Sequence, residues 1–370
     1  MLKDALKLLK KIENYGFEAY IVGGYARDLY LKKESIDIDI CTNATPRDLI
    51  GIFNDGYFSE ENYGSLNLKY NNNNYQITTY RKEKEYIDNR YPEKIEYINS
   101  LEEDLKRRDF TINTLCIDSN GKYVDIMGAI KDIDNKVIKM VGDPEKRLKE
   151  DSLRILRAIR FATILNFEID NNLKEYIEKY AYLLKNLSFY HKKRELDKIF
   201  SSHNKEYGIK LICDFKLNKY LGITNIEKIK PINSLLGIWA QLDVDNNYIF
   251  SKNEKEVLYK IKDLLKVNCL NNYHLYRNDL SIIYIVCEIK NISKEIVLIK
   301  YQTLPIKSRN DINIKNYEIL NILGERYKCK LNQIWIDLEN KILSNKIINK
   351  KEDIIDYIKN LNIQNDKNKV

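Results

Sequence analysis

Two aspartates separated by one residue stand in a run of alternating apolar and acidic residues, Ile36–Ile40. Side chains at i and i+2 of a β-strand share a face, so the run predicts a strand that places the carboxylates of Asp37 and Asp39 side by side. Its isoleucines are expected to point into a core. Two adjacent carboxylates repel each other unless a cation lies between them. Oxygen ligands suit Mg²⁺, which is usually shared with substrate phosphates, so the pair predicts a magnesium site.

The turn upstream of these aspartates contains Gly23 and Gly24, which follow a short apolar strand predicted at Tyr20–Val22. Glycine lets backbone N–H groups approach a triphosphate closely. Arg27 follows in a helix-like segment. A phosphate-binding turn beside a metal site is the combination that nucleotidyl transfer requires. The alternative is a solvated surface strand after an ordinary turn, which a lone pair of aspartates would favour and this combination disfavours.

A second cluster, Arg107-Arg108-Asp109, precedes an apolar segment. Arginine offers planar donors to phosphate and sugar oxygens, and aspartate accepts hydrogen bonds from ribose hydroxyls. The cluster therefore predicts contacts to the sugar and phosphates of a nucleotide. A purely structural ion pair between Arg108 and Asp109 is the alternative.

A third cluster lies in the stretch Glu150–Phe167, whose apolar residues follow helical spacing. Asp151 and Arg154 are at positions i and i+3, so we expect them to be neighbours on one face of a helix. Arg157 and Arg160 extend its basic side. The alternative is an ordinary surface ion pair, worth about 0.2–0.5 kcal/mol.

The elements between these clusters favour a β-containing domain. Two alternating runs, Ser65–Tyr70 and Tyr75–Tyr80, are separated by Asn71–Asn74. Asparagine tolerates left-handed turns, so a β-hairpin is predicted, and it would join the aspartate strand in one mixed or antiparallel sheet. The stretch Arg81–Glu96 is crowded with charge and tyrosine without a clear period. We interpret it as a mobile, functional loop beside the site, and an ordinary surface loop without a function is the alternative.

The composition predicts a globular protein of two or more domains. Of the 370 residues, 44% are hydrophobic and 31% charged, and no apolar run is long enough for a membrane span. The N-terminus does not have the pattern of a secretory signal, so we expect a cytoplasmic protein. Six scattered cysteines without a CxxC pair, and three histidines, disfavour a zinc site. The net charge of +8 is compatible with a polyanionic partner but does not establish one.

In this order the motifs resemble the class II nucleotidyltransferases that add CCA to transfer RNA, together with their poly(A) polymerase relatives. The resemblance covers roughly the first 165 residues, and the combination of motifs is highly specific. The motifs that carry it are Gly23–Asp28 with Asp37, Asp39 and Thr42; Arg107–Asn113; Asp118, Gly121, Asp125 and Gly128; and Glu150–Asp151 with Arg154, Arg157 and Arg160–Ala162.

The resemblance implies an α+β fold. An N-terminal head similar to the catalytic domain of DNA polymerase β, with a mixed sheet, would be followed by an all-helical neck, body and tail. The expected boundaries are 1–140 for the catalytic head, 141–200 for a neck that recognises the base, 201–285 for the body and 286–370 for a tail that binds tRNA.

The resemblance also implies an activity, which is addition of the 3′-terminal CCA to tRNA from CTP and ATP, without a nucleic-acid template and with Mg²⁺. The partner is the 3′ end and acceptor arm of tRNA, and no membrane is involved. Asp37 and Asp39 would be the catalytic residues that hold the metal. The residues implied for nucleotide binding are Gly23, Gly24, Arg27, Arg108, Asp109, Asn113, Asp151, Arg154, Arg157 and Arg160.

The chain departs from the family pattern in two places. Gln76 stands where a glutamate is common, and His191 stands where an arginine is usual. The strand after Gly64 lacks the paired basic residues and phenylalanine typical of bacterial poly(A) polymerases. The chain keeps Arg81–Glu96, which enzymes that add only CC largely lack. An enzyme that adds only A would have the same pattern, and a non-catalytic RNA-binding protein is the alternative from another class, which the intact aspartate pair disfavours.

Overall fold

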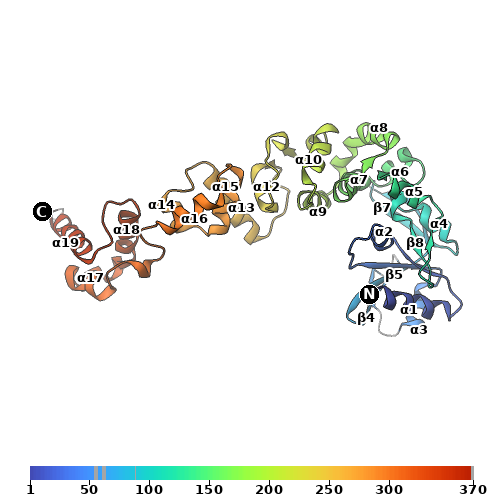
Figure 1. Cartoon of the computed structure of the whole chain (residues 1–370), viewed down its shortest axis with the longest axis horizontal. Helices are drawn as coiled ribbons and strands as arrows, with labels where there is room; N and C mark the ends of the chain where they lie inside the picture. The colour runs from blue at the N-terminus through green and yellow to red at the C-terminus, as the bar shows by residue number, and fades with distance from the viewer. Residues whose placement is uncertain (54–56, 61–63, 88, 368–370) are drawn as a thin grey trace. The chain divides into compact units, whose positions relative to one another are not determined.

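The computed structural model describes residues 1–370 except 54–56, 61–63, 88 and 368–370. The chain divides into two compact units, one made of Met1–Lys228 with Asp243–Ile249 and the other of Ile229–Leu242 with Phe250–Val370 (Figure 1). The finer division into head, neck, body and tail stays a prediction. Within the described ranges no helix is long and apolar enough to cross a bilayer.

A seven-stranded mixed sheet forms the core of the N-terminal part, in the order β3-β4-β5-β2-β1-β8-β9. The aspartate strand β2 (Ile38–Thr42) pairs antiparallel with β1 (Ala19–Val22) and parallel with β5 (Asn73–Thr79). The mixed sheet predicted from the sequence is therefore confirmed. The other strands are β3 (Tyr57–Glu60), β4 (Ser65–Tyr70), β8 (Cys116–Ile117) and β9 (Tyr123–Val124).

The hairpin of β4 and β5 turns at Asn71 and Asn72, whose φ angles of 47° and 63° are left-handed, as predicted. The aspartate strand begins later than expected. Ile38 and Ile40 are buried, but Ile36 lies before β2 and is 75% exposed, so its prediction as a core residue is wrong. Ile36 is not paired with a neighbouring strand, so its side chain does not lie on the buried face of the sheet.

The segment expected to be an irregular loop forms a second hairpin. β6 (Arg81–Ile87) and β7 (Tyr91–Tyr97) pair antiparallel in a two-stranded sheet of their own. The loop interpretation is therefore wrong. A two-stranded ribbon that does not join the main sheet need not bury one whole face, so its sequence carries no alternation. Asp88, a charged residue of this segment, lies outside the described residues.

The predicted helix over Glu150–Phe167 is interrupted. α6 (Pro144–Glu150) ends before Asp151, which is extended with φ −140° and ψ 99°, and α7 (Leu153–Leu165) begins after Ser152. The expectation that Asp151 and Arg154 are neighbours within one helix is therefore wrong.

Helices fill the rest of the first unit. They are α1 (Leu2–Glu13), α2 (Gly24–Tyr30), α3 (Pro46–Ile52), α4 (Leu101–Lys106), α5 (Ala129–Asp134), α8 (Asn171–Tyr180), α9 (Phe189–Phe200), α10 (Lys205–Asp214) and α11 (Asn218–Leu221), with 3₁₀ turns at Thr111–Asn113, Ala181–Asn186 and Ile226–Lys228. Two short strand pairs interrupt them, β10 (Val137–Ile138) with β11 (Glu168–Ile169) and β12 (Ile223–Thr224) with β13 (Asp243–Val244).

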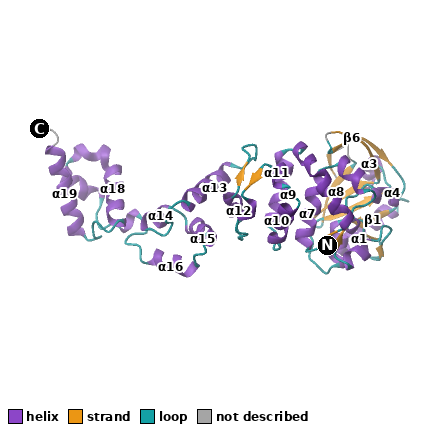
Figure 2. Cartoon of the chain, turned by 90° about the horizontal axis from the view of Figure 1, so that it is seen from above, coloured by secondary structure: helices purple, strands orange, loops and turns teal. Residues whose placement is uncertain are grey.

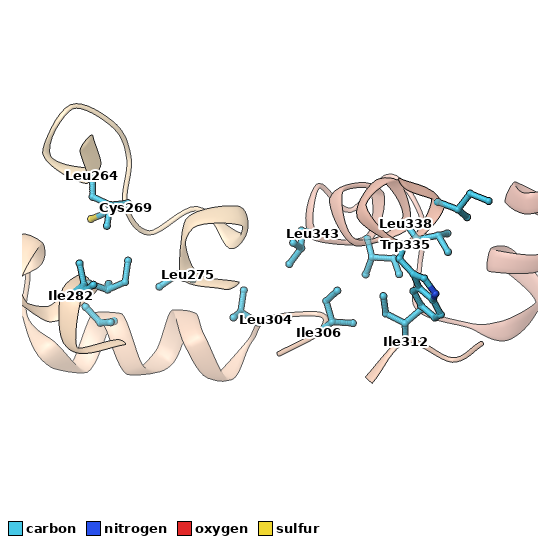
Figure 3. Packing of buried hydrophobic residues seen from close by; sticks show 14 of the residues in the cluster. Leu264, Cys269, Leu275, Ile282, Leu304, Ile306, Ile312, Trp335, Leu338 and Leu343 are labelled. Atoms are coloured by element: carbon cyan, nitrogen blue, oxygen red, sulfur yellow. The ribbon is translucent and has the colours of Figure 1, made fainter. Parts of the chain in front are cut away.

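The described part of the second unit is helical, and the strands drawn in Figure 2 all belong to the first unit. This confirms the helical prediction for the C-terminal part. Its core is apolar, and Figure 3 shows Trp335 beside Leu338 and Ile312 within it. The helices are α12 (Leu235–Gln241), α13 (Lys252–Leu265), α14 (Asn272–Arg277), α15 (Leu280–Ile289), α16 (Lys294–Gln302), α17 (Asn316–Leu323), α18 (Leu331–Leu343) and α19 (Lys351–Lys367).

Candidate active site

A cavity of about 470 Å³ opens beside β2, between the sheet and the junction of α6 and α7. Every predicted site residue except Asp37 and Arg160 lines it. The lining is Gly23, Gly24, Arg27, Asp39, Arg81, Arg90, Arg107, Arg108, Asp109, Asn113, Asp151, Arg154, Arg157 and Phe161. Residues that are far apart in the sequence are thus brought to one cationic cavity.

The glycine turn places backbone directly against the charged groups of the cavity. Gly23 has a φ of +82°, a conformation that favours glycine. A Cβ at this position would lie 3.6 Å from Nη1 of Arg108 and 3.7 Å from Oδ2 of Asp39. The absence of a side chain therefore leaves space for a ligand between the turn and these two residues.

Backbone pairing on both sides fixes the position of Asp39. Its neighbours across the ladder are Val22 on β1 and Gln76 on β5. Its carboxylate opens onto the cavity, and removal from water raises its pKa, as does the like charge of Asp37, whereas Arg108 opposes the rise. A cation between the two carboxylates would relieve this cost. The described residues contain no cluster of three or more Cys, His, Asp or Glu that could hold a metal, so the candidate site rests on the two aspartates.

A continuous hydrogen-bond chain joins α2 to α7 through Asp109. Arg27 Nη1 donates to Oδ1 of Asn113 at 2.6 Å, and Asn113 Nδ2 donates to Oδ1 of Asp109 at 3.0 Å. Arg157 Nε donates to Oδ2 of Asp109 at 2.7 Å. Burial alone would raise the pKa of Asp109, but Arg157 and these hydrogen bonds outweigh it and hold that pKa well below its usual range. The carboxylate therefore stays ionised at neutral pH.

The suggested ion pair between Arg108 and Asp109 does not form. Arg108 instead contacts the fully buried Asp104, with Nη2 and Oδ2 3.3 Å apart, while Asp109 pairs with Arg157. The two neighbouring residues thus belong to separate networks, and Arg108 faces Asp39 and the turn.

Asp151 and Arg154 are fixed by different partners. Asp151 accepts hydrogen bonds from Arg90 Nη1 at 2.7 Å and from the Leu153 amide at 3.1 Å. Arg154 Nη1 donates to the carbonyl of Arg147 at 2.6 Å. In the described part of the chain the two side chains do not pair with each other, so the surface ion-pair alternative is wrong. Burial raises the pKa of Asp151, and Arg90 and Arg154 oppose that rise.

Sequence comparisons identify relatives over the whole chain. Models described as "Poly A polymerase head domain" and "Probable RNA and SrmB-binding site of polymerase A" match residues 19–139 and 166–222. A CCA-adding enzyme of Ligilactobacillus salivarius is 32% identical over 390 residues, covering 97% of this chain and 96% of that enzyme. A CCA-adding enzyme of Staphylococcus haemolyticus is 32% identical over 391 residues, covering 97% and 98%. The chain belongs to the CCA-adding enzyme family.

Solved structures of CCA-adding enzymes share its fold. The Bacillus stearothermophilus enzyme in complex with CTP superposes with a TM-score of 0.82 at 24% identity, covering 98% of both chains. The Thermotoga maritima enzyme complexed with tRNA superposes with a TM-score of 0.71 at 19% identity, covering 96% of this chain and 94% of that one. As a member of the CCA-adding enzyme family the protein is a nucleotidyltransferase, and the family implies dependence on a divalent metal ion.

Arg160, which the motifs of the CCA-adding family nominate for nucleotide binding, lies behind the cavity. Its Nη1 donates to buried Glu195 at 3.0 Å. The ring of Phe161 lines the cavity instead, with the guanidinium carbons of Arg27, Arg157 and Arg160 at 5.3, 5.5 and 4.3 Å from its centroid. Aromatic faces attract cations, so Phe161 stabilises the arginines around it.

Sequence reasoning missed a buried carboxylate that organises several of the arginines. Asp104 accepts from Arg107 Nε at 2.8 Å and from the Arg81 amide at 3.2 Å, and it also contacts Arg108. The spacing of Asp104 from Arg107 and Arg108, which follow it by three and four residues at the end of α4, was the available signal. Arg81 and Arg90 come from the segment that the sequence placed beside the site, and both line the cavity, but no local pattern singled out these two arginines.

Proposed function

We propose that this protein adds the 3′-terminal CCA to transfer RNA from CTP and ATP without a nucleic-acid template. Its relatives are named CCA-adding enzymes, and solved members of the fold carry CTP, ATP or tRNA. The observation that carries the proposal is one cavity that joins Asp39, the glycine turn and the Asp151–Arg154 pair. A carboxylate platform, a phosphate site and a base-recognition site are the three parts that this reaction needs.

Mg²⁺ is the metal we assign to Asp37 and Asp39, because carboxylate oxygens are the ligands that Mg²⁺ prefers. When bound, it supplies the Lewis acid that activates the RNA 3′-hydroxyl and offsets the charge of the triphosphate. Asp39 is held for this purpose by backbone pairing on both sides, and Asp37 contributes from just before the strand.

The phosphates and the ribose are bound by the chain's own groups. The Gly23–Gly24 turn offers its backbone to the triphosphate, and Arg27 supplies charge from the last turn of α2. Arg108 and Asp109 position the ribose. Asp109 is ionised and accepts hydrogen bonds, so it suits ribose hydroxyls as donors.

Base selection follows from the donor and acceptor types of Asp151 and Arg154. Cytosine and adenine both present an amino donor beside a ring-nitrogen acceptor. A carboxylate accepts from the amino group, and a guanidinium donates to the ring nitrogen. Uracil and guanine reverse both positions, which leaves buried groups unpaired at a cost of about 1–3 kcal/mol each. One pair of side chains can therefore admit CTP and ATP and reject UTP and GTP.

The second hairpin connects to this pair through its tip. Arg90 contacts Asp151, and Asn89 accepts a hydrogen bond from the Ser152 amide through its carbonyl. A base that bonds to Asp151 must share or displace Arg90. We therefore assign the hairpin a part in adding the terminal A, the step in which the base in the site changes.

The helical body and tail are assigned to the tRNA itself, and the neck keeps its assignment to recognition of the base. Such contacts go mainly to the phosphate backbone, so the affinity for tRNA is expected to fall steeply with salt. The four-part division and the cytoplasmic location stay predictions.

The deciding experiment is incubation of tRNA that lacks CCA with labelled CTP and ATP in the presence of Mg²⁺. Extension by three nucleotides is expected, and UTP and GTP should not be incorporated. Product length also tests the alternatives within the family, since an A-adding enzyme extends only tRNA that already ends in CC, and a poly(A) polymerase gives a long tail. Binding of tRNA without any extension would overturn the assignment and favour a non-catalytic RNA-binding protein.

A further inference from the structure

Asp104 of α4 is a fully buried carboxylate that the proposed reaction does not use directly. Its two oxygens have different partners. Oδ1 accepts from the Arg81 amide at 3.2 Å and from Arg107 Nε at 2.8 Å, whereas Oδ2 accepts from Arg108 Nη2 at 3.3 Å. Burial alone would raise the pKa of Asp104, but Arg107 and Arg108 outweigh burial and hold that pKa below its ordinary value. A buried anion therefore lies behind the arginines of the nucleotide cavity.

The main chain at Arg108 is held separately from its side chain. Nη2 of Arg147 donates to the carbonyl of Arg107 and, at 2.9 Å, to the carbonyl of Arg108. The Arg108 amide donates to the carbonyl of Leu105 at 3.1 Å. Because the main chain is fixed, the direction of the long side chain depends on the groups that its guanidinium contacts. Within the described part of the chain, the ion pair that Arg108 forms is with Asp104.

Arg108 also lies within reach of Asp39. Nη1 of Arg108 and Oδ2 of Asp39 are 3.6 and 3.7 Å from the point where a Cβ on Gly23 would lie. The two charges interact, since burial raises the pKa of Asp39 and Arg108 opposes that rise. Among the residues that the structure describes, however, Arg108 and Asp39 form no ion pair, and the buried Nε of Arg108 has no hydrogen-bond partner. Arg108 is thus close enough to turn toward Asp39 but is held by Asp104 instead.

An ion pair between Arg108 and Asp39 would obstruct the metal site. A guanidinium commonly binds a carboxylate through two parallel hydrogen bonds, which occupy both carboxylate oxygens. Those oxygens are the ligands that a divalent metal ion needs. Asp39 is fixed by pairing of β2 with β1 and β5, so it cannot move away from the guanidinium. The side chain of Arg108 must therefore be kept apart from it.

We propose that Asp104 is a positioning residue that holds the guanidinium of Arg108 away from Asp39, so that Asp39 stays available to a divalent metal ion. This inference rests on the proposed function, in which Asp39 holds the metal and Arg108 contacts the ribose. The pairing with Asp104 keeps Arg108 beside the nucleotide without competition for the metal ligand. When the negative charge of Asp104 is removed, Arg108 turns toward Asp39, the carboxylate near its Nη1.

Asp104→Asn tests this inference with little change in shape. Asparagine keeps Oδ1 and puts an NH₂ donor in place of Oδ2, the acceptor of Arg108. The measurement is binding of Mn²⁺, a paramagnetic ion that also takes oxygen ligands, by electron paramagnetic resonance without nucleotide or RNA. The Kd of Mn²⁺ should rise about tenfold, because the guanidinium competes with the metal for Asp39. Addition of CTP should fall most at low Mg²⁺ and recover in part at high Mg²⁺. Asp39→Asn is the reference variant and should abolish the Mn²⁺ binding.

A double variant separates positioning from a general loss of structure. If Arg108 itself blocks the metal, Arg108→Ala in the Asp104→Asn background should restore the Kd of Mn²⁺ to that of the unaltered protein. Addition of CTP should stay low, because the contact to the ribose is lost. Arg108→Ala alone, in which Asp104 keeps Arg107, should bind Mn²⁺ at least as tightly as the unaltered protein, and this result does not depend on folding of Asp104→Asn.

Glu103→Gln is the matched control, because it removes a carboxylate from the same helix that pairs with Lys82 and Lys106. It should leave Mn²⁺ binding unchanged. The inference would be overturned by an unchanged Kd of Mn²⁺ in Asp104→Asn, by weak binding that persists in the double variant, or by weaker binding in Arg108→Ala alone. Failure of the proposed function is recognised separately, because Asp39→Asn would then bind Mn²⁺ as the unaltered protein does.

Discussion

The two walls of the nucleotide cavity hold their carboxylates by different means. On the sheet wall, Asp39 is fixed by main-chain pairing with β1 on one side and β5 on the other. On the helical wall, Asp151 sits in a break between two helices and is held by Arg90, a side chain from a separate hairpin. Main-chain ladders allow little movement, whereas an ion pair to a hairpin tip can exchange. We infer that the sheet wall carries the chemistry, which is the same in every cycle, and that the helical wall carries base selection, which must change from C to A.

The largest loss of activity should come from substitutions in the sheet wall. Asp39→Asn and Asp37→Asn should each lower the addition of both C and A by about a thousandfold or more, because several kcal/mol of metal-dependent stabilisation of the transition state is lost. Single-turnover assays with each nucleotide measure this, and thermal unfolding confirms that the variants are folded. Near-normal turnover in either variant would contradict the metal assignment.

The contact that links the two walls should matter for stability. Asp109→Asn breaks the buried pair with Arg157, which should lower the free energy of unfolding by about 3 kcal/mol at neutral pH. The pKa of Asp109 in the folded protein lies below its ordinary value of 3.8. The stabilisation is therefore complete above that pH and lost as the pH falls below it. Urea unfolding at several pH values should show the two proteins converging in acid; a constant difference would show that ionisation of Asp109 is not involved.

Removal of the hairpin segment Lys84–Glu93 should distinguish the function of the sheet wall from the function of the helical wall. Addition of CC is expected to persist, while addition of the terminal A falls by about 30-fold, since Asp151 loses Arg90, its charged partner. Gel assays with tRNA ending in CC and with tRNA lacking CCA measure the two steps. Lys94→Ala is the matched control, because the ion pair that Lys94 forms among the described residues is with Glu85 on the same hairpin. Equal loss of all three additions would mean that the hairpin serves folding or phosphate binding instead.

The smallest change in rate, but the clearest change in selectivity, should come from Arg154→Ala. It removes the donor that meets the ring nitrogen of cytosine or adenine and also removes the clash with uracil and guanine. The ratio of kcat/KM for CTP over UTP should fall about tenfold for each 1.4 kcal/mol of lost discrimination. Asp39→Asn should leave this ratio unchanged while lowering every rate. Full selectivity in Arg154→Ala would show that the base is recognised elsewhere.

The amino-acid sequence by itself determined the local features of this protein. The asparagine turn between β4 and β5, the alternation of Ile38, Asp39 and Ile40, and the helical character of the C-terminal part all depend on neighbouring residues, so they could be predicted. The order of short motifs also nominated nearly all of the cavity lining. These features can be predicted from the sequence because turns, strands and motifs each depend on only a few neighbouring residues.

Tertiary structure alone decided which charged groups pair with which. Arg108 had two acidic neighbours within five residues, Asp104 and Asp109, and spacing could not choose between them. Arg90 reaches Asp151 only because the second hairpin folds against the break between α6 and α7, a break that helical periodicity did not reveal. Ion pairs form wherever the packed elements bring long side chains together in a space that excludes water. That arrangement depends on contacts between distant segments, and no local pattern in the sequence records it.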